Sequence, residues 1–337
     1  RRVREAWEAF KDQFNKSYDN STEDLLRLKV FEENYRAIGA QETSASATYT
    51  LQLYEWSDWT EEEFRASRAG AVAGGAARLE GAVDASDVLL GGAVGSGPFS
   101  DSLDWRCNST NPKGVAGVSP VKDQGTCGSC WAFSAASIAE GVTAISDGVL
   151  LDLSVQEIVD CNYANYGCSG GTVEGGLRYF MSDGLALTED YPYENTDEQA
   201  CAASSTESVT TGTQMLVSSF SEATLMEMLY QYGPVSAVIA ASCPAFAGYK
   251  SGVLTEGCTD TCTGLDHAVT VVGYGFDAGA DLPYWIIKNS WGTEWGESGY
   301  ARLARTGDGV GVSGLLCEND AVQGAEATTS CTASFSQ

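Results

Sequence analysis

One cysteine in the segment 124–133 has the surroundings that nucleophilic catalysis requires. The segment reads Q-G-T-C-G-S-C-W-A-F, so a glutamine lies six residues before Cys130. A thiol attacks a carbonyl only as its thiolate, and the free backbone N–H groups at the start of a helix stabilise that anion. The apolar pattern predicts a helix from Cys130 to Asp147, ended by a glycine. Cys130 is therefore the candidate nucleophile.

The partners that such a thiol needs are also present. A cysteine in this local context is paired with a histidine about 130–150 residues downstream and with an asparagine. The chain has a single histidine, His267, in that window, and Asn289 follows in the run K-N-S-W. We expect His267 to act as base and acid, with Asn289 holding its ring in the useful tautomer. The side-chain amide of Gln124 and the backbone N–H of Cys130 would form the oxyanion hole.

Other interpretations of these residues are weaker. The spacing Cys127-x-x-Cys130 also occurs in redox pairs and zinc sites, but the sequence lacks the βαβ pattern of the first. A zinc site needs two further ligands at typical spacing, and His267 is not placed for it. A lone histidine is often structural, and Asn289 could belong to an aromatic core strand. A buried asparagine then needs a partner, which His267 supplies. We expect no metal and no other cofactor.

Composition limits the partners and the compartment. The 337 residues carry a net charge of −27, which argues against nucleic acid or an anionic membrane as a partner. The charge fits either solubility in a secretory or saline setting or work at acid pH. No apolar run approaches the roughly 18 residues of a membrane span. The first residues lack the apolar core of a signal peptide, so we expect any targeting segment to have been removed.

Cysteine usage points to an oxidising compartment. The chain has eleven cysteines, and an odd number leaves one thiol unpaired or pairs it between chains. N-x-S/T triplets at Asn15, Asn20 and Asn108 are candidate glycosylation sites. We expect a monomer that is lysosomal or vacuolar, or secreted.

The chain divides into three parts. Residues 1–68 are charged, helical in period and free of cysteine. Residues 69–98 are a Gly/Ala-rich linker that cannot fold alone. Such a linker is open to cleavage, which we expect within roughly residues 85–101. Residues 99–337 hold every cysteine. There, helices predicted at 130–147, 172–182 and 222–232 are followed by β-type runs at 235–240, 268–274, 284–288 and 300–304. This order predicts an α+β enzyme with a cleft between a helical half and a β half.

These motifs together resemble the papain family of cysteine proteases, of the cathepsin L-like kind, in its proenzyme form. The resemblance in the third part rests on the Cys130 segment, D-W-R at 104–106, C-S-G-G at 168–171, D-H-A at 266–268 and N-S-W at 289–291. The first part is similar to the family's inhibitory prodomain in a helix signature at Glu23, Arg27, Phe31, Asn34 and Ile38, although Glu42 takes the place of its last asparagine. In the family stretch that follows, G-x-N-x-F-x-D, Asp58 matches the aspartate and Trp56 takes the place of the phenylalanine.

The resemblance implies a papain-like two-lobed fold, with a helical left lobe and a β-barrel-like right lobe behind an N-terminal, mainly helical prodomain. The prodomain would occupy the cleft, in reverse of the substrate direction, until it is cleaved. The alternative is a plain helical packing domain. The expected domains are the prodomain at 1–68, the linker at 69–98 and the peptidase domain at 99–337.

The family also implies which residues act. It makes Cys130, His267 and Asn289 catalytic and places Gln124 in the oxyanion hole. The implied substrate-binding residues are the backbone of Gly170 and Gly171, the shielding Trp291, Asp266, a pocket wall of Thr172, Val238, Leu265 and Ala268, and a pocket floor at Glu318. An apolar pocket with an acid at its floor would accept Phe or Leu and also Arg as the second residue before the cut. Alternatively, Glu318 is a solvated surface acid.

Disulfide pairing follows the family in part. The resemblance implies the pairs Cys127–Cys168 and Cys161–Cys201. The family partner of Cys258 falls at Ser313, so Cys317 is the expected substitute. Cys107–Cys331 and Cys243–Cys262 would then complete the set and leave Cys130 free.

The expected activity is that of an endopeptidase zymogen that hydrolyses peptide bonds through a covalent acyl-enzyme. Exopeptidase relatives that clamp a substrate terminus with extra histidines are not matched, because the chain has no spare histidine. Two alternatives stay open: the same triad acting as a peptide ligase or transpeptidase, and a non-catalytic secreted binding protein on the same fold. The expected partners are protein or peptide substrates and the chain's own prodomain.

Overall fold

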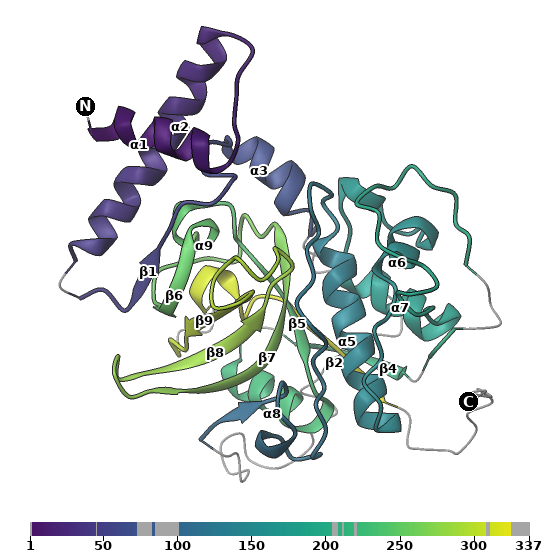
Figure 1. The fold of residues 1–337 in the computed structure, drawn as a ribbon. Helices are drawn as coiled ribbons and strands as arrows, with labels where there is room; N and C mark the ends of the chain where they lie inside the picture. The colour runs from purple at the N-terminus through teal and green to yellow at the C-terminus, as the bar shows by residue number, and fades with distance from the viewer. Residues whose placement is uncertain are drawn as a thin grey trace.

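The computed structural model describes residues 2–44, 46–72, 83–84, 101–203, 208–210, 212–218, 221–307 and 311–324. Figure 1 shows a helical N-terminal unit lying over a sheet-containing lobe, with a helical lobe beside it. The expected α+β, two-lobed fold with a mainly helical prodomain is confirmed.

Capping residues in the sequence fix where the prodomain helices begin. The prodomain elements are α1 (Arg2–Gln13), α2 (Ser21–Glu42), β1 (Tyr49–Leu51) and α3 (Glu61–Arg68). The Asn20 side chain accepts hydrogen bonds from two backbone N–H groups in the first turn of α2. Thr60 and Glu63 form a reciprocal capping box at the start of α3. These contacts satisfy N–H groups that have no partner within their helix.

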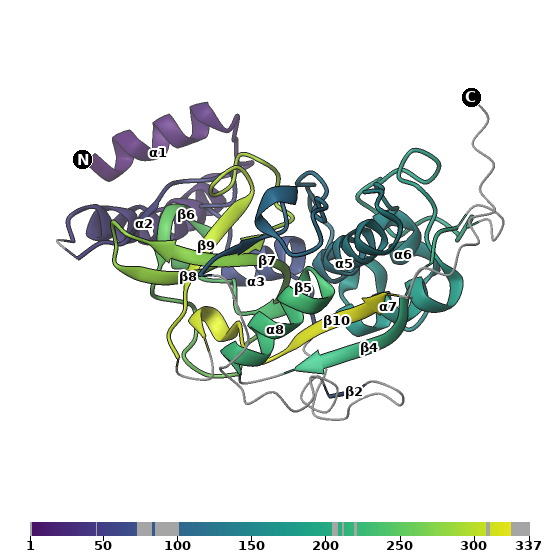
Figure 2. The same cartoon turned by 90° about the horizontal axis from the view of Figure 1, so that it is seen from below.

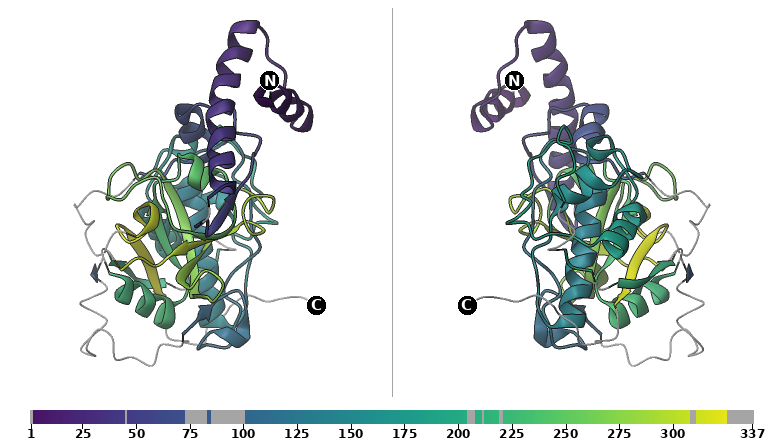
Figure 3. Two further views of the ribbon diagram at one scale, coloured as in Figure 1. Left: turned by 90° about the vertical axis from the view of Figure 1, so that its left-hand side faces the viewer. Right: turned by 90° about the vertical axis from the view of Figure 1, so that its right-hand side faces the viewer.

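Three aromatic side chains make the core between α1 and α2. Trp7, Phe10 and Phe31 are fully buried against one another, with the Phe31 ring 4.9 Å from Phe10 and 5.1 Å from Trp7 between centroids. Figure 3 shows that α1 and much of α2 project from the rest of the molecule. The attachment of α1 to α2 therefore depends on a small apolar cluster.

The helical lobe is centred on one buried helix. Its elements are α5 (Cys130–Asp147), α6 (Val155–Cys161) and α7 (Val173–Asp183), with a 3-10 turn at Gly167–Ser169. Another 3-10 turn, Asn108–Thr110, belongs to the second lobe. Ser154 caps α6 and Thr172 caps α7 through their side-chain oxygens. Helix α5 ends where Gly148 adopts the left-handed conformation at φ 74°.

The second lobe is built on the sheet. Its elements are β3 (Leu103–Asp104), β4 (Gly212–Ser218), α8 (Glu222–Tyr232), β5 (Val235–Ile239), α9 (Pro244–Ala247), β6 (Tyr249–Leu254), β7 (His267–Asp277), β8 (Leu282–Lys288), β9 (Tyr300–Ala304), a 3-10 turn at Val312–Gly314 and β10 (Asn319–Gly324). Among the described strands, the order is β1-β6-β9-β8-β7-β5-β10-β4-β2, where β2 is Val83–Asp84, and β3 pairs with β7. Figure 2 shows β10 and β4 reaching from this lobe toward α5 and α7.

The two lobes share apolar contacts where the site residues lie. The cluster around α5 includes Val238 from β5 and Ala268 from β7, next to Cys130. The start of α5 is therefore packed directly on the start of β7. No helix in the described parts of the chain is long and apolar enough to cross a membrane.

We predict that Phe31→Ala destabilises the prodomain by about 3–5 kcal/mol, because the substitution leaves a cavity in this small core. The measurement is urea unfolding of the full chain followed by tryptophan fluorescence, with Cys130 replaced by alanine to remove the candidate nucleophile. Leu25→Ala is the matched control on the same helix, since Leu25 is 58% exposed and should change stability by less than about 0.5 kcal/mol. Equal effects of the two substitutions would contradict the prediction.

Candidate active site

Cys130 is a buried thiol at the start of α5. Its side chain is 0% exposed, and the backbone N–H of Ala268 donates to its sulfur at 3.4 Å. Burial raises the pKa of this thiol to about 12, and the charge of Asp266 acts in the same direction. Hydrogen bonds from backbone N–H groups, including that of Ala71 after the prodomain, offset part of the increase. In the full chain Cys130 is therefore a neutral thiol.

Strands β7 and β8 bring His267 and Asn289 together. His267 begins β7, Asn289 follows the end of β8, and the two strands are antiparallel neighbours. The ring Nε2 of His267 lies 2.7 Å from Oδ1 of Asn289. The backbone N–H of Ser290 also donates to this Oδ1, at 2.8 Å, which fixes the orientation of the amide. Because an amide oxygen only accepts, Nε2 carries the proton and the neutral ring leaves Nδ1 free to accept one.

Burial keeps the His267 ring neutral. The residue is 0% exposed, and the Trp291 ring lies 4.6 Å away between centroids. Removal from water lowers the pKa of His267 to about 4, although the hydrogen bond to Asn289 and the charge of Asp266 act in the opposite direction. Within the described residues, Nδ1 has no hydrogen-bond partner. His267 is therefore a neutral imidazole in a defined tautomer, able to take up a proton.

The side-chain amide of Gln124 is held by its own hydrogen bonds. Its Oε1 accepts from the Ser290 hydroxyl at 2.7 Å, and its Nε2 donates to the Cys127 carbonyl at 3.0 Å. The same Nε2 lies 3.5 Å from the carbonyl oxygen of Ala69, which follows the prodomain. A carbonyl of the prosegment thus lies near the donor that the sequence predicts for an oxyanion.

The segment after α3 runs between the two lobes and bonds to both. The N–H groups of Gly70 and Ala71 each donate to the Asp266 carbonyl at 2.9 Å. On the other side, the Gly171 N–H donates to the Gly70 carbonyl at 2.9 Å, and the Val72 N–H donates to the Gly171 carbonyl at 2.8 Å. The Gly171 backbone, expected to bind an extended substrate, is therefore occupied by this segment, whereas the Gly170 N–H donates to the Gly167 carbonyl and its carbonyl accepts from Tyr166.

Small side chains allow this close passage. Gly70 has φ +122°, and a Cβ there would lie 2.2 Å from the Gly128 carbonyl oxygen. Ala71 is 7% exposed and belongs to the same apolar cluster as Cys130 and Ala268. Any larger residue at position 70 would push the segment away from the helix that carries the thiol.

The residues expected to form the specificity pocket lie around this segment. Only the backbone contact of Glu318 places it there. Val238 and Ala268 are buried in the cluster that contains Ala71, and Leu265 packs against it. Thr172 caps α7 with its side chain, which accepts from the Gly175 N–H at 3.2 Å. Glu318 is half-buried, and its carbonyl accepts from the Val238 N–H at 3.2 Å, so it adjoins the expected wall.

Two residues that contact Trp291 were missed by sequence reasoning. The Arg68 carbonyl accepts from the Trp291 indole N–H at 2.9 Å, and its buried guanidinium pairs with Asp123 at 2.7 Å and with Glu55 at 2.5 Å. Phe246 packs edge-on against Trp291 with centroids 5.6 Å apart. The only sequence signal for Arg68 was its place as the last basic residue before the Gly/Ala-rich segment. Phe246 lies in a four-residue helix that has no periodic pattern.

The disulfides correct part of the expected pairing. The structure forms Cys127–Cys168 and Cys161–Cys201, as expected. The expected pairs Cys258–Cys317 and Cys243–Cys262 are wrong, because the structure joins Cys243 to Cys258 and Cys262 to Cys317. The chain turns from α9 into β6 and returns Cys258 to within 5.5 Å of Cys243, between Cα atoms. Ser313 still adjoins Cys258, and its hydroxyl accepts from the Cys258 N–H at 3.0 Å, but it has no sulfur to offer.

Two thiols are free in the described parts of the chain, and one of them is Cys130. The other, Cys107, is exposed, with its sulfur 3.2 Å from the Ser109 hydroxyl. Cys331, its expected partner, lies outside the described residues. Across those residues there is no group of three or more His, Cys, Asp and Glu side chains that could hold a metal ion.

Comparisons with known proteins agree with this geometry. Residues 99–318 match the family described as papain family cysteine protease, and residues 7–64 match the cathepsin propeptide inhibitor domain. The chain is 37% identical to a cathepsin L-like proteinase of Phaedon cochleariae over 90% of this chain and 89% of the relative. It is 38% identical to digestive cysteine proteinase 1 of Homarus americanus over 89% of each chain. A digestive procathepsin L 3 from the larval midgut of Tenebrio molitor has a similar structure, with a TM-score of 0.77 and 33% identity over 95% of this chain and 99% of that one.

We predict that the two free thiols differ in reactivity in the intact proenzyme. At pH 8, iodoacetamide should label Cys107 quickly, because hydrogen bonding from Ser109 lowers the pKa of this exposed thiol. Cys130 should react at least about tenfold more slowly, since only the thiolate is reactive and its pKa is raised to about 12. Peptide mapping by mass spectrometry measures both sites in the same sample. Removal of the prodomain should raise the rate at Cys130 and leave that at Cys107 unchanged; equal rates in the proenzyme would refute the assignment.

Proposed function

Because this chain belongs to the papain family of cysteine proteases and carries the family's inhibitory propeptide, it is a protease proenzyme, and we propose that Cys130 is its nucleophile. His267 is its acid and base, and Asn289 is the residue that orients the histidine. Gln124 and the Cys130 backbone N–H are the oxyanion donors. The support is the geometry around the single histidine: one protonated nitrogen bound to Asn289 and one nitrogen free to accept.

The reaction would proceed through two acyl transfers. The Cys130 proton moves to Nδ1 of His267, and the thiolate attacks the substrate carbonyl carbon, whose oxygen takes the charge near Gln124. The imidazolium then gives its proton to the amine as the C–N bond breaks, which leaves a thioester on Cys130. Water attacks the thioester with His267 as base, and the acid product departs as the thiol reforms.

The prodomain inhibits by occupying the substrate's place. The family match to an inhibitory propeptide and the hydrogen bonds of residues 70–72 to both lobes support this role. We place the domains at 1–68, 69–98 and 99–337. The end of α3 at Arg68 supports the first boundary. The start of the papain-family match at residue 99 supports the last, and the linker between them would be cut to release the enzyme.

Glu318 would add a charge to the pocket for the second residue before the cut. Its carbonyl is bonded to Val238, whose side chain lies in the cluster with Cys130 and Ala71. Its charge is also felt by Asp320, a buried carboxyl whose pKa is raised chiefly by burial and further by Glu318 and Glu174. A substrate with arginine at this position would bring a positive charge to these acids. We therefore infer acceptance of arginine as well as leucine or phenylalanine.

The compartment would be oxidising during folding. Four disulfides form in the described parts of the chain, and such bonds persist in secreted and lumenal proteins. The three candidate glycosylation asparagines, Asn15, Asn20 and Asn108, are all exposed. We propose a monomeric glycoprotein of a lysosome, a vacuole or the extracellular space that acts on protein or peptide substrates.

The assignment of the nucleophile predicts a specific labelling pattern. After removal of the prodomain, an epoxysuccinyl thiol reagent should modify Cys130 with one reagent per chain and abolish peptide hydrolysis. Cys130→Ala should lose both labelling and turnover, and Gln124→Ala should lower kcat by about 10²–10³-fold, the usual effect of one lost oxyanion donor. Cys107→Ser is the control and should keep full activity. Turnover by Cys130→Ala, or no labelling of the intact site, would defeat the proposal.

The pocket assignment predicts a change in selectivity. Glu318→Gln should lower kcat/KM for peptides with arginine at the second position before the cut by at least about tenfold, as expected for the loss of a charge-assisted contact of roughly 1.5–3 kcal/mol. Matched peptides with leucine at that position should change by less than about twofold. Equal changes for both peptides would show that Glu318 is a solvated surface acid.

A further inference from the structure

One loop of the peptidase domain binds the prodomain through its backbone. We call residues 243–258 the docking loop; it contains α9 and β6. Prodomain groups bond to its backbone: the Gln52 N–H donates to the Gly248 carbonyl at 2.8 Å, and the Trp56 indole N–H donates to the Ala247 carbonyl at 3.1 Å. These contacts lie outside the segment that occupies the catalytic site.

Strand pairing extends the same contact. Prodomain strand β1 is antiparallel to β6, from Tyr49 opposite Gly252 to Leu51 opposite Tyr249. On the other edge of β6, only Val253 and Leu254 pair with β9. Among the described strands, the first part of β6 therefore has the prodomain as its only strand neighbour. This half of the docking loop receives little sheet support from the peptidase domain itself.

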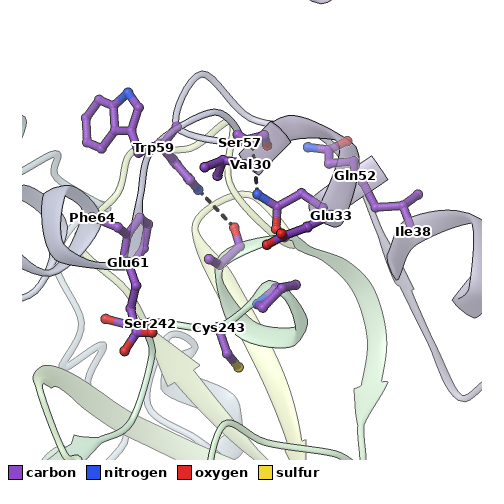
Figure 4. Close-up of a pocket in the computed structure, with 15 residues that line it drawn as sticks. Val30, Glu33, Ile38, Gln52, Ser57, Trp59, Glu61, Phe64, Ser242 and Cys243 are labelled. Atoms are coloured by element: carbon purple, nitrogen blue, oxygen red, sulfur yellow. Dashed lines mark hydrogen bonds between the residues drawn. The ribbon is translucent and has the colours of Figure 1, made fainter. Parts of the chain in front are cut away.

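The Cys243–Cys258 disulfide closes the docking loop at its two ends. Cys243 is the N-cap residue of α9, and Cys258 follows the end of β6. Figure 4 shows the first of these cysteines at the edge of a pocket whose opposite wall is the prodomain, including Trp59 and Phe64. The pocket has a volume of about 200 Å³. Both cysteines are half-buried, in contrast to Cys127, which is 1% exposed.

From this placement we propose that the Cys243–Cys258 disulfide is a redox site that controls how tightly the prodomain is held. The co-reactant is a dithiol reductant, either a small molecule or a protein with a reactive thiol pair. Reduction of this disulfide would make the docking loop more flexible and weaken its binding to the prodomain. A reducing environment would then favour activation in addition to keeping the Cys130 thiol reduced.

The exchange is balanced as a two-electron transfer. A thiolate of the reductant attacks one sulfur of the bridge, the S–S bond breaks, and the other cysteine leaves as a thiolate. The second thiol of the reductant, as its thiolate, then attacks the mixed disulfide and releases the first cysteine. The reductant departs as a disulfide, and its two protons end on the thiols of Cys243 and Cys258.

The consequence follows from chain entropy. A cross-link between two ends of a short loop removes many of its open conformations, and cutting it restores them. The loop has buried anchors at Phe246 and Tyr249, so reduction should loosen the backbone that faces the prodomain without unfolding the domain. The carbonyls of Ala247 and Gly248, which bond the prodomain, lie between the two cysteines. The disulfide keeps these two carbonyls at the spacing that the prodomain donors require.

The chain supplies its own control in the second disulfide of this lobe. Cys262–Cys317 is also half-buried and has the same Cα separation of 5.5 Å, but both of its cysteines lie outside the docking loop. Its removal should therefore leave the prodomain contact intact. The proposal concerns only prodomain docking, so it is tested in the Cys130→Ala proenzyme and does not depend on the proposed catalytic residues.

The test is amide hydrogen exchange in the Cys130→Ala proenzyme with either disulfide removed. Cys243→Ser with Cys258→Ser should speed exchange at residues 48–54 and 249–254 at least about tenfold, and Cys262→Ser with Cys317→Ser should leave both segments protected. Cleavage of the linker by a trace of active enzyme should be faster in the first variant only. Protection that is equal in the two variants would overturn the proposal.

A titration of the unaltered disulfides covers the case in which a variant fails to fold. The Cys130→Ala proenzyme is equilibrated with increasing dithiothreitol, and differential alkylation measures the reduction of each bridge. Loss of protection at residues 48–54 should follow the reduction of Cys243–Cys258, while β7 and β8 stay protected. Full protection after complete reduction of that bridge would refute the proposal.

Discussion

The position of Trp291 is the constraint on which the rest of the structure depends. Its indole N–H donates to the Arg68 carbonyl at 2.9 Å, and its ring lies 4.6 Å from His267 between centroids. The prodomain rings of Trp56 and Phe64 pack edge-on against the same indole at 5.7 Å and 5.3 Å. Edge-to-face aromatic contacts of this kind are directional as well as apolar. One side chain therefore screens the histidine from water and receives the prodomain, so inhibition and site construction share one packing arrangement.

Ion pairs determine the position in which the prodomain docks on the peptidase domain. Arg68 is almost fully buried, yet it pairs with Glu55 of the prodomain and with Asp123 of the peptidase domain. Arg65 forms a second ion pair, with Asp266, which precedes His267, at 3.2 Å. A buried guanidinium that loses a partner is strongly destabilising, so a shifted docking position would be penalised. In a chain with a net charge of −27, these two arginines also place positive charge where acidic groups of both domains meet.

Local patterns predicted more of this protein than long-range ones could. The helix beginning at Cys130 and the strand after His267 were predicted because apolar period, glycine punctuation and motif spacing are written in consecutive residues. The partner of Cys258 was not predicted, because it depends on how a four-residue helix and strand β6 fold back in space. Arg68 was missed for a related reason: an arginine is ordinarily exposed, and its burial is decided by carboxylates from two domains. The role of Glu318 depends on where its side chain points relative to the substrate, which spacing along the chain does not determine.

The proenzyme is kept inactive both by the covered active site and by the neutral forms of Cys130 and His267. The carbonyl of Ala69 already lies near the Gln124 amide, so a substrate carbonyl finds that donor engaged. The same burial raises the pKa of Cys130 to about 12 and lowers that of His267 to about 4, which holds both groups neutral. Both shifts are caused chiefly by burial, to which the segment after the prodomain contributes at Cys130, because Ala71 lies in the same apolar cluster. Burial disfavours the charged form of a thiol and of an imidazole alike, so a segment that covers the site also opposes its ionisation.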